Sequence, residues 1–115
     1  MDYYSARLLF IILIDDGKPR KRNRCDESIV VFKARDFEDA FRRAVEIGRE
    51  NETDYLNYDG QKVRWAFVAV DGLDHVGKTV DGMEVASKLH YRTSKQPVPF
   101  RRRFHPERSK PVQSF

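Results

Sequence analysis

The residues from Gly72 to Thr79 read Gly-Leu-Asp-His-Val-Gly-Lys-Thr and match in form the phosphate-binding loop of nucleotide hydrolases. Such a loop binds phosphate because its backbone amides surround the anion and a helix begins at its Lys-Thr pair. Here Asp74 would place a negative charge inside the loop, and Asp81-Gly82 and a predicted strand follow where the helix should run. The remaining chain is also too short for the strands that position Mg²⁺ and water. We interpret the match as accidental and predict no cofactor.

Carboxylates flank the same segment, and one histidine lies inside it: Asp71, Asp74, Asp81, Glu84 and His75. Carboxylates with a histidine can bind a divalent cation or act as acid and base. Their spacing follows no ligand motif, however, and turn capping and cross-strand pairing account for them. No Ser/His/Asp or Cys/His arrangement follows from the other histidines. The sequence therefore predicts no catalytic residues, no metal site and no enzyme activity.

Basic residues form two groups, one between residues 18 and 24 and one near the C-terminus, where phenylalanines interrupt them. Flexible segments of this composition contact phosphates while their rings stack on bases. They also fold onto acidic surfaces of protein partners, and some are only solvated. The residues predicted to bind a partner or nucleic acid are Lys18, Arg20, Lys21, Arg22, Arg24, Phe100, Arg101, Arg102, Arg103, Phe104, Arg108 and Lys110.

The net charge of +4 is unevenly distributed over the 115 residues. Residues 95–115 contain six Lys or Arg and one Glu, which gives +5, so residues 1–94 sum to −1. Cys25 is the single cysteine, which excludes an intramolecular disulfide. The apolar segment 8–14 is too short to cross a membrane, and the acidic residues around it do not fit a secretion signal. We expect a cytoplasmic protein with no membrane contact.

The first half of the chain predicts two strands and a helix. Residues 3–14 are dense in β-branched and aromatic residues, and from Leu8 both faces are apolar, which is typical of the interior of a sheet. A basic loop follows, and residues 28–34 form the second strand. Asp36 is expected to cap a helix, with Asp39 reaching back toward the cap. The apolar face of this helix consists of Phe37, Ala40, Phe41, Ala44, Val45 and Gly48. Its small residues would let the helix lie close to a sheet.

The second half predicts strands at 54–58, 61–70 and 83–91, with a tight turn at Asp59-Gly60 and irregular chain over 72–82. On the strand that carries Trp65, strict alternation places Phe67 with Trp65 and places Val70 on the other face. From Thr93 the chain contains four of its five prolines and no apolar periodicity. We expect one α+β domain over 1–92, with one helix on a largely antiparallel sheet of about five strands in the order β-β-α-β-β-β. Residues 93–115 are expected to be a basic tail, irregular or bound to a partner.

Several segments together resemble the DUF4288 family of small bacterial proteins, over residues 3 to 91. They are Ala6-Arg7-Leu8-Leu9-Phe10, Phe32-Lys33-Ala34-Arg35-Asp36-Phe37-Glu38-Asp39-Ala40, Tyr58-Asp59-Gly60-Gln61-Lys62-Val63-Arg64-Trp65 and Asp81-Gly82-Met83-Glu84-Val85. The resemblance implies a bacterial source and this domain. It implies no activity and no catalytic residues.

One helix covers one face of such a sheet, so the second apolar face needs another cover. The function expected first is therefore a non-catalytic protein-interaction module, such as an accessory or toxin-neutralising, immunity-type partner in bacteria. It would bind a protein partner or a second copy of itself through the uncovered sheet face and the tail. The alternative is a nucleic-acid-binding accessory protein that uses the 18–24 loop and the 95–110 tail.

Overall fold

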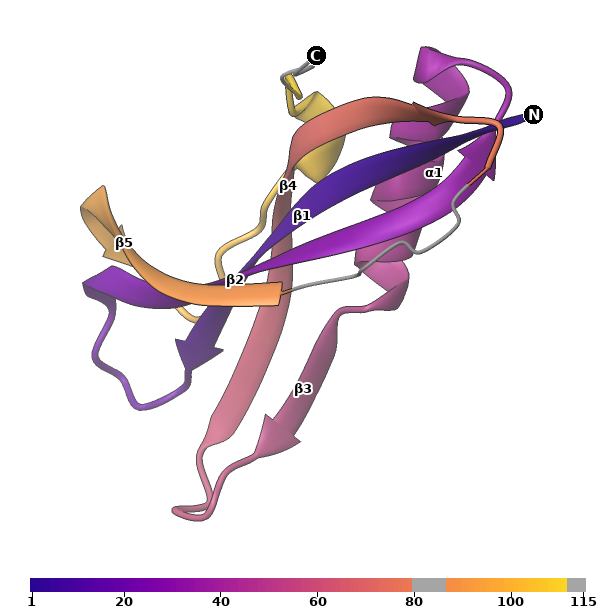
Figure 1. Cartoon of the computed structure of the whole chain (residues 1–115). Helices are drawn as coiled ribbons and strands as arrows, with labels where there is room; N and C mark the ends of the chain where they lie inside the picture. The colour runs from indigo at the N-terminus through magenta and orange to yellow at the C-terminus, as the bar shows by residue number, and fades with distance from the viewer. Residues whose placement is uncertain (80–86, 112–115) are drawn as a thin grey trace.

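A computed structural model describes residues 1–79 and 87–111 of the chain. It contains one α-helix on an antiparallel five-stranded sheet in the spatial order β3-β4-β1-β2-β5 (Figure 1). The elements are β1 (Asp2–Ile14), β2 (Arg20–Ala34), α1 (Phe37–Glu50), β3 (Thr53–Leu56), β4 (Lys62–Gly77), β5 (Ser87–Val98) and the short 3-10 helix η1 (Pro106–Arg108). The predicted α+β class and element order are confirmed. Within the described ranges, no helix has the length and apolar character needed to cross a membrane.

Strand β1 lies at the centre of the sheet, paired with β2 on one side and β4 on the other. Its alternate side chains enter two different cores, since Leu8 is fully buried on the helix side and Leu9 is 4% exposed on the other. This explains the run of apolar residues without polar alternation. The predicted interior position is confirmed.

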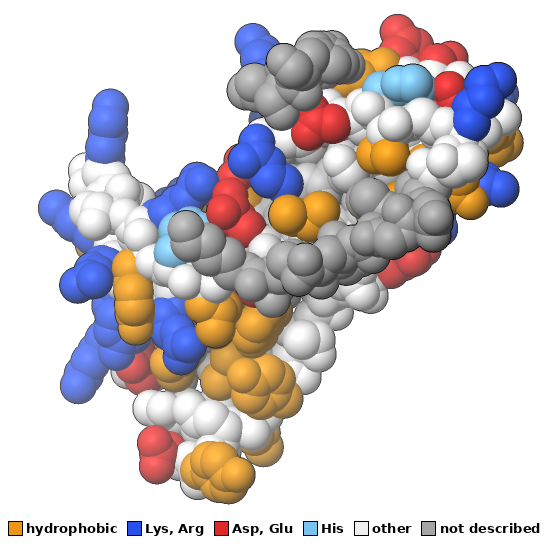
Figure 2. Space-filling view, viewed as in Figure 1, with side chains coloured by type: hydrophobic (Ala, Val, Ile, Leu, Met, Phe, Trp, Pro, Cys, Tyr) orange, Lys and Arg blue, Asp and Glu red, His pale blue; other side chains and the backbone are white. Residues whose placement is uncertain are grey.

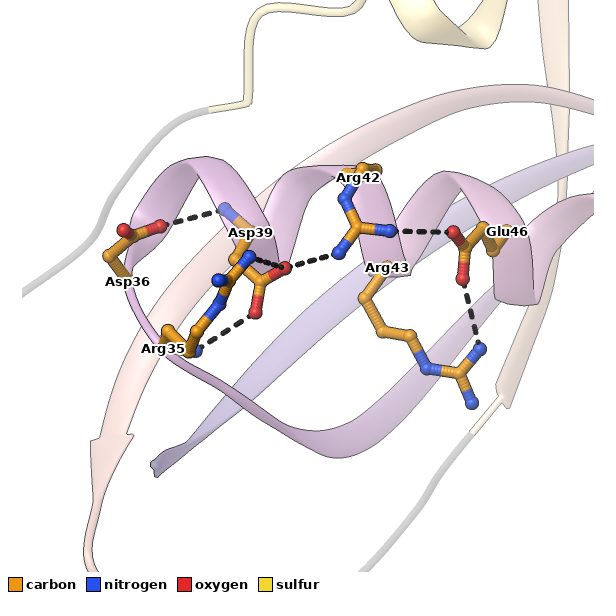
Figure 3. A network of polar contacts seen from close by, with 6 residues as sticks. All are labelled: Arg35, Asp36, Asp39, Arg42, Arg43 and Glu46. Atoms are coloured by element: carbon orange, nitrogen blue, oxygen red, sulfur yellow. Dashed lines mark hydrogen bonds and ion pairs between the residues drawn. The ribbon is translucent and has the colours of Figure 1, made fainter.

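Helix α1 begins where its capping residues satisfy the free amides of the first turn. The Asp36 carboxylate accepts a hydrogen bond from the Asp39 amide at 2.8 Å, as predicted for an N-cap (Figure 3). The Asp39 carboxylate reaches back to the Arg35 amide at 3.0 Å, one residue before the cap, and also pairs with Arg42. These hydrogen bonds, led by the one from the Arg35 amide, hold the pKa of Asp39 well below its ordinary value.

The small residues of α1 bring the helix close to the sheet, as predicted. Ala40 and Ala44 have no exposed surface, and Gly48 faces the ring of Phe67. A Cβ atom at Gly48 would lie 2.3 Å from Phe67 Cε2. The helix covers only the half of the sheet near the N-terminus of β1, and the β3–β4 hairpin extends beyond it (Figure 1).

Irregularities in β4 change which of its side chains face the helix. The register with β1 shifts between Leu9 and Phe10, which pair with Ala69 and Phe67, and again between Arg7 and Leu8. Each shift inserts an extra residue, which reverses the facing of the residues that follow. Val70 therefore joins Phe67 in the core beneath the helix. The prediction that Val70 lies on the opposite face is wrong, because strict alternation assumes a strand without bulges.

The chain after β5 covers the second face of the sheet. Leu9, Ile11, Leu13, Cys25, Ala66 and Val98 form a separate buried cluster against which Val68, Phe100 and Phe104 pack. The Arg64 guanidinium donates to the carbonyl oxygens of Phe100 and Arg102 at 3.0 and 2.9 Å. Further along, the Ser109 hydroxyl accepts from the Val70 amide at 3.0 Å, and Glu107 pairs with Arg49 at 2.7 Å. Residues 98–109 thus take part in the fold.

Three strands are longer than the sequence predicts. β2 begins at Arg20, so the basic segment expected as a loop is paired, and β4 continues to Gly77. β5 runs to Val98, so the prediction of an irregular tail from Thr93 is wrong for residues 93–98; its expected start at Met83 lies outside the described residues. The physical reason is pairing: β1 supplies partners for β4 as far as Gly77, and the start of β2 and the end of β5 supply partners for each other, so polar residues that would not form a strand by themselves are extended.

The β3–β4 connection is also wider than the predicted two-residue turn. β3 ends at Leu56, and the Asn57 side-chain oxygen accepts from the amides of Asp59 and Gln61. An asparagine side chain that replaces a backbone acceptor in this way stabilises a turn. Gly60 adopts a φ of 75°, which glycine tolerates without strain.

Candidate functional site

The first six residues of the segment that matches the phosphate-binding motif are extended. Gly72 to Gly77 lie in β4 and pair with Arg7 to Tyr3 of β1, so the prediction of an irregular segment is wrong here. Because their amides belong to a strand, they do not surround an anion. A Cβ atom at Gly72 would lie 2.6 Å from Arg7 Nε, so this glycine accommodates a side chain from the next strand.

The carboxylates near this segment have separate partners. Asp71 accepts from Arg92 at 3.1 Å, and Asp2 accepts from His75 Nε2 at 2.8 Å. The hydrogen bond from His75 lowers the pKa of Asp2. Asp81 and Glu84 lie outside the described residues. Over 1–79 and 87–111, no three His, Cys, Asp or Glu side chains gather where they would hold a metal ion.

The predicted binding residues fall on different surfaces. Arg20, Arg22 and Arg24 line one cavity on the helix side of the sheet. Lys21 and Arg102 line another on the opposite side. Four of the remaining predicted cations lie after β5, with Arg101 and Arg103 at two further depressions, Arg108 in η1 and Lys110 after it. Lys18 lies in the turn between β1 and β2. The set therefore does not form one continuous patch.

The two predicted phenylalanines have a structural role. Phe100 and Phe104 pack against the buried cluster on the second face of the sheet. Their rings are half-buried, and the buried part of each ring contacts this cluster. Removing them would expose the core they cover.

The cavity lined by the arginines is a groove of about 360 Å³ in the part of the sheet that α1 leaves uncovered. We call it the arginine–tyrosine groove, and define it by Arg20, Arg22, Arg24, Tyr55 and Tyr91, with Ile12 and Ile14 between them. Arg24 pairs with Ile12 of β1 on one side and with Tyr91 of β5 on the other. Tyr55 comes from the opposite side of the groove, in β3.

The aromatic rings of the groove are held in place but remain accessible. Tyr55 is 50% exposed and accepts a hydrogen bond from Trp65 Nε1 at 3.4 Å, whereas Tyr91 is 55% exposed. The guanidinium carbon of Arg22 lies 4.5 Å from the centre of the Tyr91 ring, in a cation–π contact. Figure 2 shows basic side chains gathered over β2 and β5, next to hydrophobic ones that continue toward the β3–β4 hairpin.

The groove is electropositive. Arg20 is neutralised by Asp16, with which it forms an ion pair. Among the described residues, neither Arg22 nor Arg24 pairs with a carboxylate. Two charged guanidinium groups and two accessible phenol rings therefore share one concave surface.

The sequence contained a signal for this groove. Arg20, Arg22 and Arg24 are spaced by two, so in a strand all three project from one face. Residues 18–24 were expected to form a loop, in which side chains spaced by two do not necessarily share a face, so the spacing of the arginines did not indicate a common surface. Tyr55, Tyr91, Ile12 and Ile14 could not be added, since only the sheet order brings β3 and β5 near the start of β2.

Comparison with known proteins identifies a family but no relative of known function. No curated protein and no solved structure matches the chain. The model of one family, described as a domain of unknown function, matches residues 3–87. This range includes β1 to β4 and α1, while almost all of β5 and the chain after it lie outside it. The protein thus belongs to the DUF4288 family, as the resemblance of its sequence motifs indicated.

Proposed function

We propose that the protein is a nucleic-acid-binding accessory protein that binds single strands in the arginine–tyrosine groove. The observation that carries the proposal is the convergence of Arg22, Arg24, Tyr55 and Tyr91 in one concave surface. It takes precedence over a partner at the second sheet face, because Val98, Phe100 and Phe104 already pack on that face.

The chemistry of the groove suits a single strand better than a duplex. Unpaired bases can stack on phenol rings and on guanidinium planes, whereas the bases of a duplex are covered by their neighbours. The Arg22–Tyr91 pair offers one such platform and Tyr55 another. The guanidinium groups supply charge to the phosphates without reading sequence.

The expected salt dependence follows from the number of cations. Contacts of phosphates with Arg22 and Arg24, the two uncompensated cations, predict a slope of log K against log salt concentration near about −1.4 for a single strand. Affinity would then fall roughly 7-fold between about 50 and 200 mM salt. The observed slope reports how many arginines contact phosphate.

The test uses fluorescence anisotropy with labelled oligo-dT, oligo-U and a duplex of equal length. Replacing both Arg22 and Arg24 by Gln should weaken binding of the single strands and reduce the slope by about 1.4. Tyr91→Ala should weaken binding by about 1–3 kcal/mol, with little change in slope. The matched control replaces Arg101 and Arg103 by Gln, which removes the same charge elsewhere. An equal loss in the control, or preference for the duplex, would refute the proposal.

We also infer a second function, a protein-interaction module, which includes an accessory or immunity-type role. It is supported by the tip of the β3–β4 hairpin, where Leu56 is 66% exposed and Tyr58 is fully exposed. Exposed apolar residues at a hairpin tip are suited to a protein contact. Replacing both by Ser should abolish recovery of a partner in pull-downs from the native host. Recovery that does not change would contradict a contact at the hairpin.

A further inference from the structure

A second cavity lies on the face of the sheet opposite the arginine–tyrosine groove. It measures about 260 Å³, and its walls are mainly apolar, formed by Leu9, Ile11, Val68 and Phe104. Leu9 and Ile11 are part of the buried cluster of this face, at 4% and 7% exposed. Phe104 belongs to the chain after β5, so the cavity is complete only when that segment lies on the sheet.

The mouth of this cavity is basic. Lys21 of β2 and Arg102 of the tail both line it and are exposed. Neither side chain pairs with a carboxylate within the described part of the chain. Arg92 also lines the cavity, but it donates to Asp71 at 3.1 Å and lies 3.9 Å from Glu27, so its charge is compensated. Two uncompensated cations therefore stand at the entrance of an apolar space.

The cysteine in this cavity is structural. Cys25 is 3% exposed, and burial raises the pKa of its thiol. Its Sγ atom lies 3.8 Å from the carbonyl oxygen of Asn23, to which it donates. A protonated, buried thiol adds apolar surface to the wall and offers no nucleophile.

From these contacts we infer that this cavity binds a small organic acid with an apolar body. The body would lie against Leu9, Ile11 and Val68, and the acid group would remain at the mouth beside Lys21 and Arg102. Pockets of this size enclose molecules smaller than most drugs. Apolar walls contribute affinity in proportion to the area they remove from water, and the two cations select an anion over a neutral molecule.

The test titrates the full chain with sodium octanoate and with octan-1-ol, which has the same length and no charge. Methyl NMR should show octanoate-induced shifts at Leu9, Ile11 and Val68. Replacing both Lys21 and Arg102 by Gln should weaken octanoate about tenfold, since each exposed ion pair contributes modestly, and should leave octan-1-ol unchanged. Phe104→Ala should weaken both ligands.

The matched control is the Arg22→Gln and Arg24→Gln double variant, which removes the same charge from the opposite face and should bind octanoate as the wild type does. Octan-1-ol that binds as tightly as octanoate would overturn the assignment of an acid. Methyl shifts at Ile12 and Ile14, which line the arginine–tyrosine groove, in place of Leu9 and Ile11 would overturn the site. The same Arg22→Gln and Arg24→Gln variant is the test of nucleic-acid binding in the arginine–tyrosine groove. Loss of nucleic-acid binding and loss of octanoate binding are therefore separate outcomes, and either proposal can fail without the other.

Discussion

The contact between Gly48 and Phe67 provides a test of how closely the helix lies on the sheet. In an open helix, Gly→Ala stabilises a protein by roughly 1 kcal/mol, because alanine loses less backbone entropy on folding. At Gly48 the new Cβ would lie 2.3, 2.4 and 2.6 Å from three ring carbons of Phe67. These separations are more than ~1 Å shorter than ordinary carbon–carbon contacts.

The ring of Phe67 cannot withdraw easily. It is 2% exposed, and its centre lies 5.4 Å from that of Phe10, which is buried at the centre of the sheet. Overpacking of such a site typically costs about 1–3 kcal/mol. This cost exceeds the helical gain of alanine over most of its range, so we expect Gly48→Ala to destabilise the protein by about 1 kcal/mol, the midpoint of the difference. For a domain of this size the melting temperature would fall by roughly 4–8 °C.

The assay is a double-mutant cycle in which the free energy of unfolding of each variant is measured by urea and thermal denaturation. Phe67→Leu alone should destabilise the fold, and Gly48→Ala should cost much less in the Phe67→Leu background, where the ring is absent. The difference in stability between Arg42→Ala and Arg42→Gly measures the alanine gain at an exposed position of the same helix. If Gly48→Ala raises stability by that same amount, the helix does not approach β4 closely and the reasoning is refuted.

Two further predictions concern charge and the tail. Because the pKa of Asp39 is depressed in the folded state, its contribution is present above the unfolded value of about 3.8 and is lost as the pH falls toward the folded value. The stability difference between wild type and Asp39→Asn should therefore be constant near neutral pH and shrink below about pH 4; a difference independent of pH would contradict it. Phe104→Ala should lower the free energy of unfolding by about 1–2 kcal/mol, less than for a fully buried ring, because Phe104 is half-buried on the second core. Denaturation identical to wild type would show that the tail does not cover that face.

Local sequence patterns predicted the elements for which intrinsic propensity, apolar periodicity and tertiary packing all favour the same structure. The helix follows from the Asp36 cap, the apolar periodicity and the small residues that face the sheet. The central place of β1 follows from its two apolar faces. In both cases propensity, pattern and packing favour one structure, which is the condition for prediction from local sequence.

Tertiary pairing determined what the local patterns could not. The segment at Arg20–Arg24 and the residues after Val70 are polar, so propensity favours loops, yet each is paired with a long neighbouring strand. The bulges of β4 reversed the facing of Val70 for the same reason: they follow from register with β1. The arginine–tyrosine groove combines β1, β2, β3, β4 and β5, so no single segment could reveal it.

The central place of β1 also has a consequence for the order of folding. Strand β1 precedes its neighbours in the chain, and it needs β2 and β4 beside it, α1 over one face and Phe104 over the other before it is fully enclosed. Such long-range closure makes folding slow compared with that of helical bundles. Until residues near 104 have left the ribosome, an apolar strand remains exposed, and an exposed strand of this composition is prone to intermolecular pairing. We therefore expect a chain with this topology to need protection from aggregation during its synthesis.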